Sequence, residues 1–317
     1  MGDTINNPGG LVAAGQGSGT AQTWGSGQGS DPVVTDHELA EVRLLVESRS
    51  GILFDGSRER FFASRVREHV AAKRLAHGSD LLRVIKTSNV EYEAFLQRLL
   101  TQETSFFRYP DIFDALQKKV LPELHMRKFW ENPRKLRIWS AGCATGEEPY
   151  SIAMVLADTL EFMDAWNVQI LATDISRHAL QHAERGVYAP SDIKNLTPKQ
   201  VETHFARAGE QFMVKPRIRS LVSFAPLNLA QPMYVGRFDC IFCMNVLIYF
   251  SEARRSALVQ RFHEYLEPGG FLFLGHAETV ANAPVRFNTI LHGDGRIYQK
   301  PSDITSVRPA PAGEVAQ

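Results

Sequence analysis

Between Asp36 and Arg127, large apolar residues recur three or four positions apart, which places them on one face of an α-helix. Three series show this spacing: Leu39, Val42, Leu45 and Val46; Leu81, Leu82 and Ile85; and Phe95, Leu96, Leu99 and Leu100. Breaks fall near Gly51–Gly56 and at His77–Gly78, and Thr35 or Asp36 can cap the first helix. The pattern predicts an all-helical N-terminal domain over residues 35–130.

After Pro133 the pattern changes to short apolar runs that alternate with helical stretches. Strands are expected at Leu136–Ser140, Val168–Thr173, Leu221–Ala225, Phe238–Cys243 and Phe271–Gly275. Helices are expected at Pro149–Leu160, Ser176–Ala183 and Glu252–Leu266. This alternation is typical of a mostly parallel, doubly wound sheet with helices on both faces. We therefore predict an α/β domain over residues 131–302, with its ligand site beyond the carboxyl ends of the strands.

Both ends of the chain have a composition that cannot bury enough apolar surface to offset the entropy of ordering. Residues 1–34 are rich in Gly, Ser, Gln and Thr, and the end of the chain carries Pro309 and Pro311. Disordered segments are therefore expected at 1–34 and 303–317.

Composition excludes several classes of protein. The 35 basic residues balance 35 acidic ones, so the chain lacks the overall basic charge of a nucleic-acid binder. The apolar runs, such as Gly269–Gly275, are too short to span a membrane, and three cysteines are too few for a disulfide framework. Cys240 and Cys243 lie in an expected buried strand and face opposite sides, which favours structural thiols over a redox or metal pair. A cytoplasmic protein without membrane insertion is expected.

The turn after the first expected strand has the clearest chemical signal. Residues Ser140–Ser151 read SAGCATGEEPYS, with glycines spaced G-x-x-x-G rather than the G-x-G-x-x-G of dinucleotide sites. Glu147 and Glu148 lie where a phosphate would otherwise bind. Carboxylates there repel an anionic ligand and favour a cation, such as the ammonium and sulfonium of S-adenosylmethionine. The alternative is an acidic cap at the start of a helix.

Polar residues also follow two later strands. Asp174 comes directly after the second strand, where a carboxylate can accept hydrogen bonds from ribose hydroxyls; alternatively, it caps the helix at Ser176. Asn245 follows the strand Phe238–Cys243, where its amide can bind an adenine edge or a bound amino acid. Tyr249 lies in the same loop, for which a packed apolar loop is the alternative.

Two segments of the helical domain carry basic residues of interest. Thr101–Arg108 reads TQETSFFR, and Arg108 is either a surface residue or a clamp for a carboxylate substrate. The run Arg58–Arg74 has a net charge of +4, and Arg60, Arg67 and Arg74 are spaced seven residues apart. Such a stripe is either a solvated helix face or a docking surface for an acidic helical partner.

Taken together, these segments resemble the chemotaxis-receptor protein-glutamate O-methyltransferases, the CheR family. The likeness extends from about Asp36 to Lys300, and its pieces occur in the family's order. It is carried by Thr101–Arg108 (TQETSFFR), Ser140–Ser151 (SAGCATGEEPYS), Ala172–Ile175 (ATDI), Asn228–Leu229 (NL), Phe238–Phe250 (FDCIFCMNVLIYF), Pro268–Gly270 (PGG) and Gly275–Glu278 (GHAE).

The resemblance implies a methyltransferase fold with a seven-stranded sheet, an N-terminal helical domain and a small antiparallel subdomain at about 205–223. It implies S-adenosylmethionine as methyl donor, S-adenosylhomocysteine as product, no metal, and the cytoplasmic helical domain of chemotaxis receptors as partner. By position, the donor site would comprise Gln102, Thr104, Arg108, Gly142, Glu148, Asp174, Asn228, Leu229, Met244 and Asn245. Arg108 and Tyr249 would flank the transferring methyl group, and related proteins often have Asn and Arg at the positions of Gln102 and Met244.

The implied reaction needs no general base, because a glutamate side chain with a pKa of about 4.3 is already ionised at neutral pH. Catalysis would come from holding the reacting atoms in line. Two alternatives remain open: a methyltransferase for another substrate, and a non-catalytic signalling protein that binds the donor. Some family members also bind a C-terminal receptor pentapeptide through the subdomain. The short turn in Arg207–Lys215, followed by Pro216, predicts that this chain does not.

Overall fold

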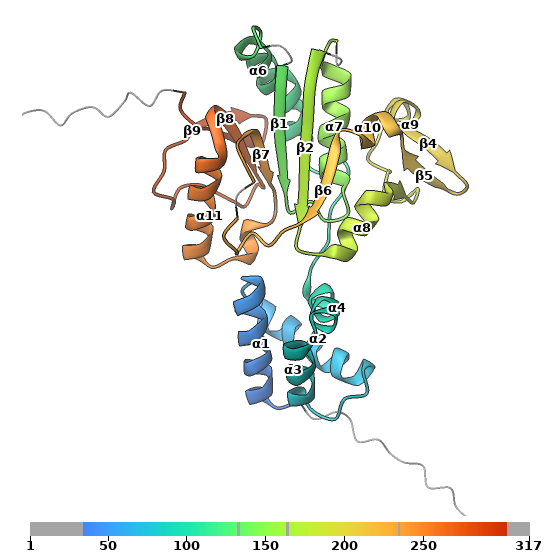
Figure 1. Cartoon of the computed structure of the whole chain (residues 1–317), viewed down its shortest axis with the longest axis vertical. Helices are drawn as coiled ribbons and strands as arrows, with labels where there is room; N and C mark the ends of the chain where they lie inside the picture. Colours follow the sequence, from blue (N-terminus) through green and yellow to red (C-terminus); the bar gives the residue numbers. More distant parts are fainter. Residues whose placement is uncertain (1–33, 132–133, 163–164, 234, 303–317) are drawn as a thin grey trace, which may run out of the picture. The chain divides into compact units, whose positions relative to one another are not determined.

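The computed structural model describes residues 34–131, 134–162, 165–233 and 235–302 (Figure 1). The disordered segments expected at 1–34 and 303–317 lie outside these residues, apart from Val34. The alternation of helices and strands matches the expected α/β class.

Four helices form a bundle with its own core. They are α1 (Asp36–Ser50), α2 (Ser57–Ala72), α3 (Gly78–Thr87) and α4 (Asn89–Leu99). Thr35 caps α1 in a capping box with Glu38, and Gly51 ends the helix in the left-handed conformation with φ of 81°. The apolar residues recognised by their spacing are buried together, among them Val42, Val46, Leu81, Ile85, Phe95 and Leu99.

Three further helical segments lie between the four-helix bundle and the domain boundary expected near residue 130. The next helical segments are α5 (Pro110–Ala115), the π-helical turn η1 (Leu116–Val120) and α6 (Leu121–Arg127). Their buried side chains, from Ile112 to Leu124, belong to the same apolar cluster as residues of the sheet, such as Ile138 and Phe242. The bundle with a separate core therefore ends at about Leu100, because helical periodicity does not reveal which core a helix packs against.

The expected basic helix Arg58–Arg74 also ends earlier than predicted. Helix α2 stops at Ala72, and Arg74 has a φ of 54°, which is a left-handed conformation outside the helix. Arg60 and Arg67 therefore share one helix face, whereas Arg74 lies in the turn that follows.

A seven-stranded sheet forms the second part of the structure. Its strands are β1 (Arg134–Ala141), β2 (Trp166–Asp174), β6 (Val222–Pro226), β7 (Phe238–Cys243), β8 (Leu266–Leu274), β9 (Asn288–His292) and β10 (Gly295–Gln299). The order is β6-β2-β1-β7-β8-β10-β9, with the first five strands parallel and β10 antiparallel to both of its neighbours. The chain reverses its direction of strand addition between β1 and β7, which marks the switch point where ligands bind.

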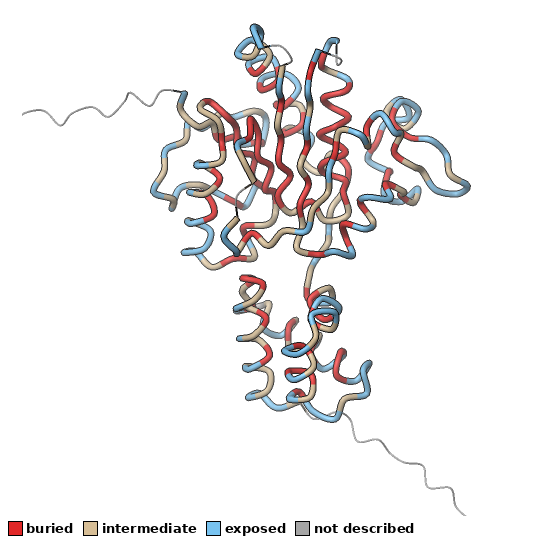
Figure 2. The backbone as a smooth tube through the Cα atoms, viewed as in Figure 1, coloured by how far each residue is buried: buried red, intermediate tan, exposed pale blue. Residues whose placement is uncertain are grey.

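Helices cover both faces of this sheet. Helices α7 (Glu147–Thr159) and α8 (Arg177–Arg185) contribute to one apolar cluster, and α11 (Glu252–Tyr265) contributes to the other. Figure 2 shows the buried central strands between these layers. Cys240 and Cys243 are buried in opposite clusters, as expected for structural thiols of a buried strand.

The small antiparallel subdomain is present but begins earlier than residue 205. Its sheet has the order β3-β5-β4, from β3 (Val187–Tyr188), β4 (Phe205–Ala208) and β5 (Gln211–Val214). Helices α9 (Pro198–His204) and α10 (Pro216–Arg219) flank the hairpin. A two-residue strand such as β3 is too short to leave a recognisable pattern, and Val222 belongs to the large sheet instead.

Candidate functional site

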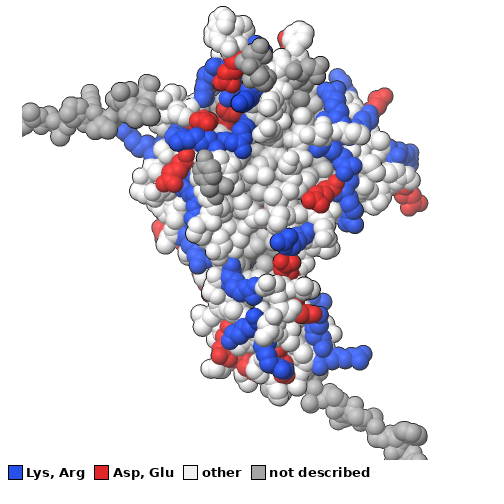
Figure 3. All heavy atoms as spheres, in the orientation of Figure 1, with Lys and Arg blue, Asp and Glu red and all other residues white. Residues whose placement is uncertain are grey.

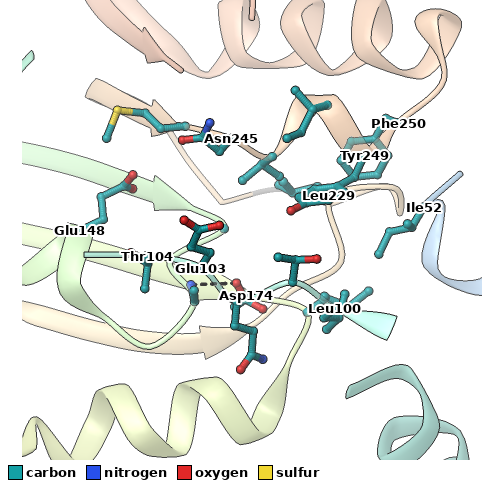
Figure 4. Close-up of a pocket in the computed structure, with 18 of the residues that line it drawn as sticks. Ile52, Leu100, Glu103, Thr104, Glu148, Asp174, Leu229, Asn245, Tyr249 and Phe250 are labelled. Atoms are coloured by element: carbon teal, nitrogen blue, oxygen red, sulfur yellow. Dashed lines mark hydrogen bonds between the residues drawn. The ribbon is translucent and has the colours of Figure 1, made fainter. Parts of the chain in front are cut away.

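One cavity of about 240 Å³ lies at the carboxyl ends of β1, β2 and β7. The residues that the family resemblance implies for the donor site, together with Tyr249, all line it: Gln102, Thr104, Arg108, Gly142, Glu148, Asp174, Asn228, Leu229, Met244, Asn245 and Tyr249. Figure 4 shows Glu148, Asp174, Asn245 and Tyr249 arranged around the cavity on different elements. Residues 147 positions apart in the chain thus form one site, from Gln102 to Tyr249.

The turn after β1 packs so closely that glycine is required at two positions. Gly142 and Gly146 both have a φ of 99°. A Cβ on Gly142 would overlap Val246, and a Cβ on Gly146 would lie 2.8 Å from the Cβ of Ala183. The N–H groups of Gly142 and Cys143 donate to the Thr173 carbonyl at 2.8 and 2.9 Å. The G-x-x-x-G sequence therefore brings bare backbone to the cavity wall.

Asp174 connects this turn to the end of β2. Its Oδ2 accepts a hydrogen bond from the Ala144 N–H at 2.9 Å, and its Oδ1 accepts one from the Ser176 N–H at 2.8 Å. Burial raises the pKa of Asp174, and these backbone hydrogen bonds act in the opposite direction. Ser176, not Asp174, is the N-cap of α8. Since a carboxylate can accept about four hydrogen bonds, Asp174 can still bind hydroxyl groups of a ligand.

Only one of the two adjacent glutamates reaches the cavity. Glu148 is buried at its wall, where Ser140 Oγ donates to Oε1 at 2.6 Å. Glu147 is also buried, but its carboxylate accepts from Thr145 Oγ1 at 2.7 Å and does not line the cavity. The expectation that both carboxylates face the ligand is wrong for Glu147, because successive helical residues point about 100° apart.

Glu148 is a buried carboxyl group. None of the ion pairs among the described residues, which join Lys, Arg or His nitrogens to carboxylate oxygens within 4.0 Å, includes Glu148. Burial raises the pKa of Glu148 to about 7; the Ser140 hydrogen bond and Arg108 lower it, and Glu278 raises it. A buried carboxylate is stabilised by a cation in contact with it, so the wall at Glu148 suits a cationic group of a ligand.

Asn245 is held in position by residues that the sequence did not identify. Its φ is 61°, and its N–H donates to Glu278 Oε2 at 2.9 Å. The hydroxyl of Tyr109 donates to Asn245 Oδ1 at 2.8 Å, and the Tyr109 ring packs on His276. This fixes the amide so that Nδ2 remains as a donor. Glu278 belongs to the GHAE segment that carries the family resemblance, but the sequence did not indicate its hydrogen bond to Asn245 or the contact of Asn245 with Tyr109.

Two predicted donor-site side chains are already bound to protein groups. Asn228 Nδ2 donates to the Arg49 carbonyl at 2.9 Å, and its Oδ1 accepts from the Ala230 N–H at 2.9 Å. Gln102 Nε2 donates to Ser176 Oγ at 2.9 Å. Both residues line the cavity, and their side chains hold its wall together.

Arg108 and Tyr249 approach the cavity from different parts of the chain. The Arg108 guanidinium is half-buried and donates to the Glu103 carbonyl at 2.7 Å. Tyr249 ends the short 3₁₀ helix η3 (Leu247–Tyr249), and its ring packs against the core of the helical bundle. Ser50 and Ile52, which the sequence did not suggest, extend this wall from the end of α1.

The lining defines what the cavity can bind. Arg108 is the one cationic side chain among the described lining residues, and no His, Lys or Cys is among them. Three carboxyl groups, those of Glu103, Glu148 and Asp174, line the cavity as well, so its acidic side chains outnumber the single cationic one. In the described part of the chain, no three His, Cys, Asp or Glu side chains are grouped so that they can hold a metal ion. None of the described helices combines the length and the apolar composition that crossing a bilayer requires.

Comparison with known proteins identifies the family to which the chain belongs. Residues 102–293 match the family model "CheR methyltransferase, SAM binding domain". A chemotaxis protein methyltransferase of Vibrio parahaemolyticus is 36% identical over 273 residues, which is 84% of this chain and 98% of that protein. Those of Borreliella burgdorferi and Escherichia coli K12 are each 34% identical, over 78% and 80% of this chain and 89% and 88% of theirs. The chain therefore belongs to the CheR methyltransferase family and carries its S-adenosylmethionine-binding domain.

Proposed function

We propose that the chain methylates glutamate side chains of chemotaxis receptors, forming methyl esters with S-adenosylmethionine as donor. The lining of the cavity supports this proposal most directly, because Arg108 is the one cationic side chain among the described lining residues, which include no His, Lys or Cys. A glutamate carboxylate is ionised at neutral pH, so it needs an orienting cation rather than a base. The relatives' names support a substrate in chemotaxis.

Each lining residue then has a distinct task. S-adenosylmethionine supplies an electrophilic methyl group on a sulfonium. Glu148 would bind the donor's ammonium, and Asp174 would accept hydrogen bonds from its ribose hydroxyls. Asn245 would offer its Nδ2 as a donor. Arg108 would orient the attacking carboxylate, with Tyr249 as the opposite wall.

The ribose role of Asp174 predicts a loss of donor affinity on substitution. Asp174→Ala removes the ligand's acceptor and two acceptors for backbone N–H groups, so binding should weaken by about 1.5–3 kcal/mol. Isothermal titration with S-adenosylhomocysteine measures this loss, and NAD, titrated as a control nucleotide, should give no binding. Unchanged affinity in Asp174→Ala would remove Asp174 from the donor site.

Docking of the receptor is assigned to the exposed face of α2. Arg60 and Arg67 are exposed on this face and have no ion-pair partner among the described residues. The acidic residues of α2, by contrast, pair with Arg43 and Arg65. Figure 3 shows positive and negative side chains mixed across one face of the molecule, in keeping with the net charge of zero. The exposed face formed by Arg60 and Arg67 is a local basic feature suited to an acidic helical partner. We propose that the two proteins meet in the cytoplasm.

The subdomain should not bind a C-terminal receptor pentapeptide. The turn between β4 and β5 has only Gly209 and Glu210, and β5 is paired on both sides. The outer strands have four and two residues, and Pro216 starts α10 directly after Lys215. Added strands need a longer free edge. Titration with the peptide should show no binding at micromolar concentrations, and micromolar binding would show that the short hairpin suffices.

Methyl transfer to a receptor fragment tests the proposed function. The chain is incubated with methyl-labelled donor and a purified receptor cytoplasmic fragment, and the protein is then treated with base. Carboxyl methyl esters hydrolyse under these conditions, so the label should leave as methanol. Label that stays on the fragment would indicate another acceptor group, and donor binding without transfer would favour a non-catalytic sensor.

A further inference from the structure

Arg58 differs from the other arginines of α2 in its surroundings. It is the second residue of the helix and is half-buried, whereas Arg60 and Arg67 are exposed. Its Nη1 donates to the Leu53 carbonyl at 2.8 Å, which holds the guanidinium against the α1–α2 linker. Arg58 therefore does not share the exposed face of Arg60 and Arg67, although it belongs to the same basic run, Arg58–Arg74.

The guanidinium of Arg58 lies over the ring of Tyr249. Its central carbon is 4.6 Å from the centre of that ring and 4.9 Å from the centre of the Phe54 ring. A cation over an aromatic face is attracted by the ring's quadrupole, more strongly when water is excluded. The partial burial of Arg58, which lowers its pKa, favours a strong contact, although the guanidinium stays charged at neutral pH.

The same linker also binds the backbone of Tyr249. The Leu53 N–H donates to the Tyr249 carbonyl at 2.9 Å, so Leu53 contacts Arg58 through its carbonyl and Tyr249 through its N–H. Tyr249 also packs against the core of the helical bundle. Tyr249, which forms one wall of the donor cavity, is therefore held in place by the core of the helical bundle and by the linker that leads into α2.

We propose that Arg58 is a positioning residue, which holds Tyr249 at the donor cavity and so connects the receptor-docking helix to methyl transfer. Arg58 acts through Tyr249 and contacts neither donor nor receptor. The proposal rests on the proposed function, since it assigns two tasks to α2: Arg60 and Arg67 dock the receptor, and Arg58 maintains the reaction site.

Matched substitutions on α2 separate these tasks in steady-state kinetics with a receptor fragment. Arg58→Leu should lower kcat about tenfold, with KM for the receptor and donor affinity unchanged. Arg60→Leu, two residues away, should raise the receptor KM and leave kcat unchanged. Arg58→Lys keeps the cation and should recover part of kcat. Similar melting temperatures for all variants ensure that folding does not explain the differences.

A double-substitution cycle tests whether Arg58 acts through Tyr249. In a Tyr249→Leu background, Arg58→Leu should cause no further loss of kcat. Independent losses that multiply, or a raised receptor KM in Arg58→Leu, would overturn the proposal and make Arg58 a docking residue. An unchanged kcat in Arg58→Leu would overturn it as well.

A measurement without a receptor distinguishes failure of this inference from failure of the proposed function. In the NMR spectrum, the ring current of Tyr249 should shift the Arg58 Nε–Hε signal, and Tyr249→Leu should remove that shift. If the wild-type chain methylates no receptor fragment, the proposed function fails. The Arg58 signal still shows whether the guanidinium contacts the Tyr249 ring. An Arg58 signal that Tyr249→Leu does not move would overturn the inference.

Discussion

Replacing Arg108 with alanine should slow methyl transfer about 100-fold, because the loss of an orienting clamp misplaces the attacking carboxylate. The guanidinium lines the cavity and is half-buried, and among the described residues its one hydrogen bond is to the Glu103 carbonyl. Its removal therefore leaves the apolar core intact. The chain should therefore stay folded. Single-turnover kinetics with a receptor fragment measures the rate, and the melting temperature verifies folding.

Two further results define what the Arg108 experiment means. Arg108→Lys keeps the positive charge but loses the planar fork of donors, so its rate should fall between those of wild type and Arg108→Ala. The exposed Arg255 of α11, changed to alanine, serves as the control and should transfer methyl groups normally. A near-normal rate in Arg108→Ala would mean that other groups orient the carboxylate.

Donor affinity should be about tenfold weaker at pH 6 than at pH 7.5, because Glu148 must lose a proton to bind the donor's ammonium. Burial raises the pKa of Glu148 from its usual 4.5 to about 7 in the free protein. Below pH 7 the carboxyl group is protonated, and binding a cation releases that proton. Titration calorimetry at pH 6 in two buffers of different ionisation enthalpy should show the release of close to one proton.

The raised pKa of Glu148 also predicts the direction of a stability change. Between pH 4.5 and about 7, the folded protein retains a proton that the unfolded chain releases. The contribution of Glu148 to folding therefore becomes less favourable as the pH rises through this window. Donor binding should offset this loss, so the increase in melting temperature on adding donor should be larger at pH 7.5 than at pH 6.

Glu148→Gln provides the control for the titration. The amide keeps the size of the side chain but carries neither the charge nor the titratable proton, so affinity at pH 7.5 should fall about 10- to 100-fold. The dependence on pH between 6 and 7.5 should disappear in this variant. If Glu148→Gln keeps the wild-type pH dependence, another group binds the proton.

Much of the sheet and of the site was predictable because both depend on short segments. Short apolar runs, which alternate with helical stretches, located the ends of β1, β2 and β7 to within about two residues, as is usual for strong patterns. Gly142 follows β1 directly, Asp174 is the last residue of β2, and Asn245 lies two residues beyond β7. The carboxyl ends of neighbouring parallel strands meet at one edge of the sheet. The meeting of these residues in one cavity follows from the topology.

The features that were missed depend on contacts between distant segments or on the phase of a helix. The hydrogen bond from Tyr109 to Asn245 joins residues 136 positions apart. The sequence of α7 does not reveal whether Glu147 or Glu148 faces the cavity, since both are buried. Arg74 lies beyond the end of α2 and adopts a left-handed conformation, which residues other than glycine rarely do, so the sequence did not indicate it. Helical periodicity likewise hid the packing of α5 and α6 against the sheet.

Locating the transferred methyl group tests the central claim most directly. A receptor cytoplasmic fragment is incubated with donor and either the wild-type chain or Arg108→Ala, then digested and analysed by tandem mass spectrometry. The account predicts one added methyl group on glutamate side chains of the fragment with the wild-type chain, and about 100-fold slower appearance with Arg108→Ala. Methylation confined to Lys, Cys or other non-carboxyl groups, or no methylation by a chain that binds the donor, would contradict it.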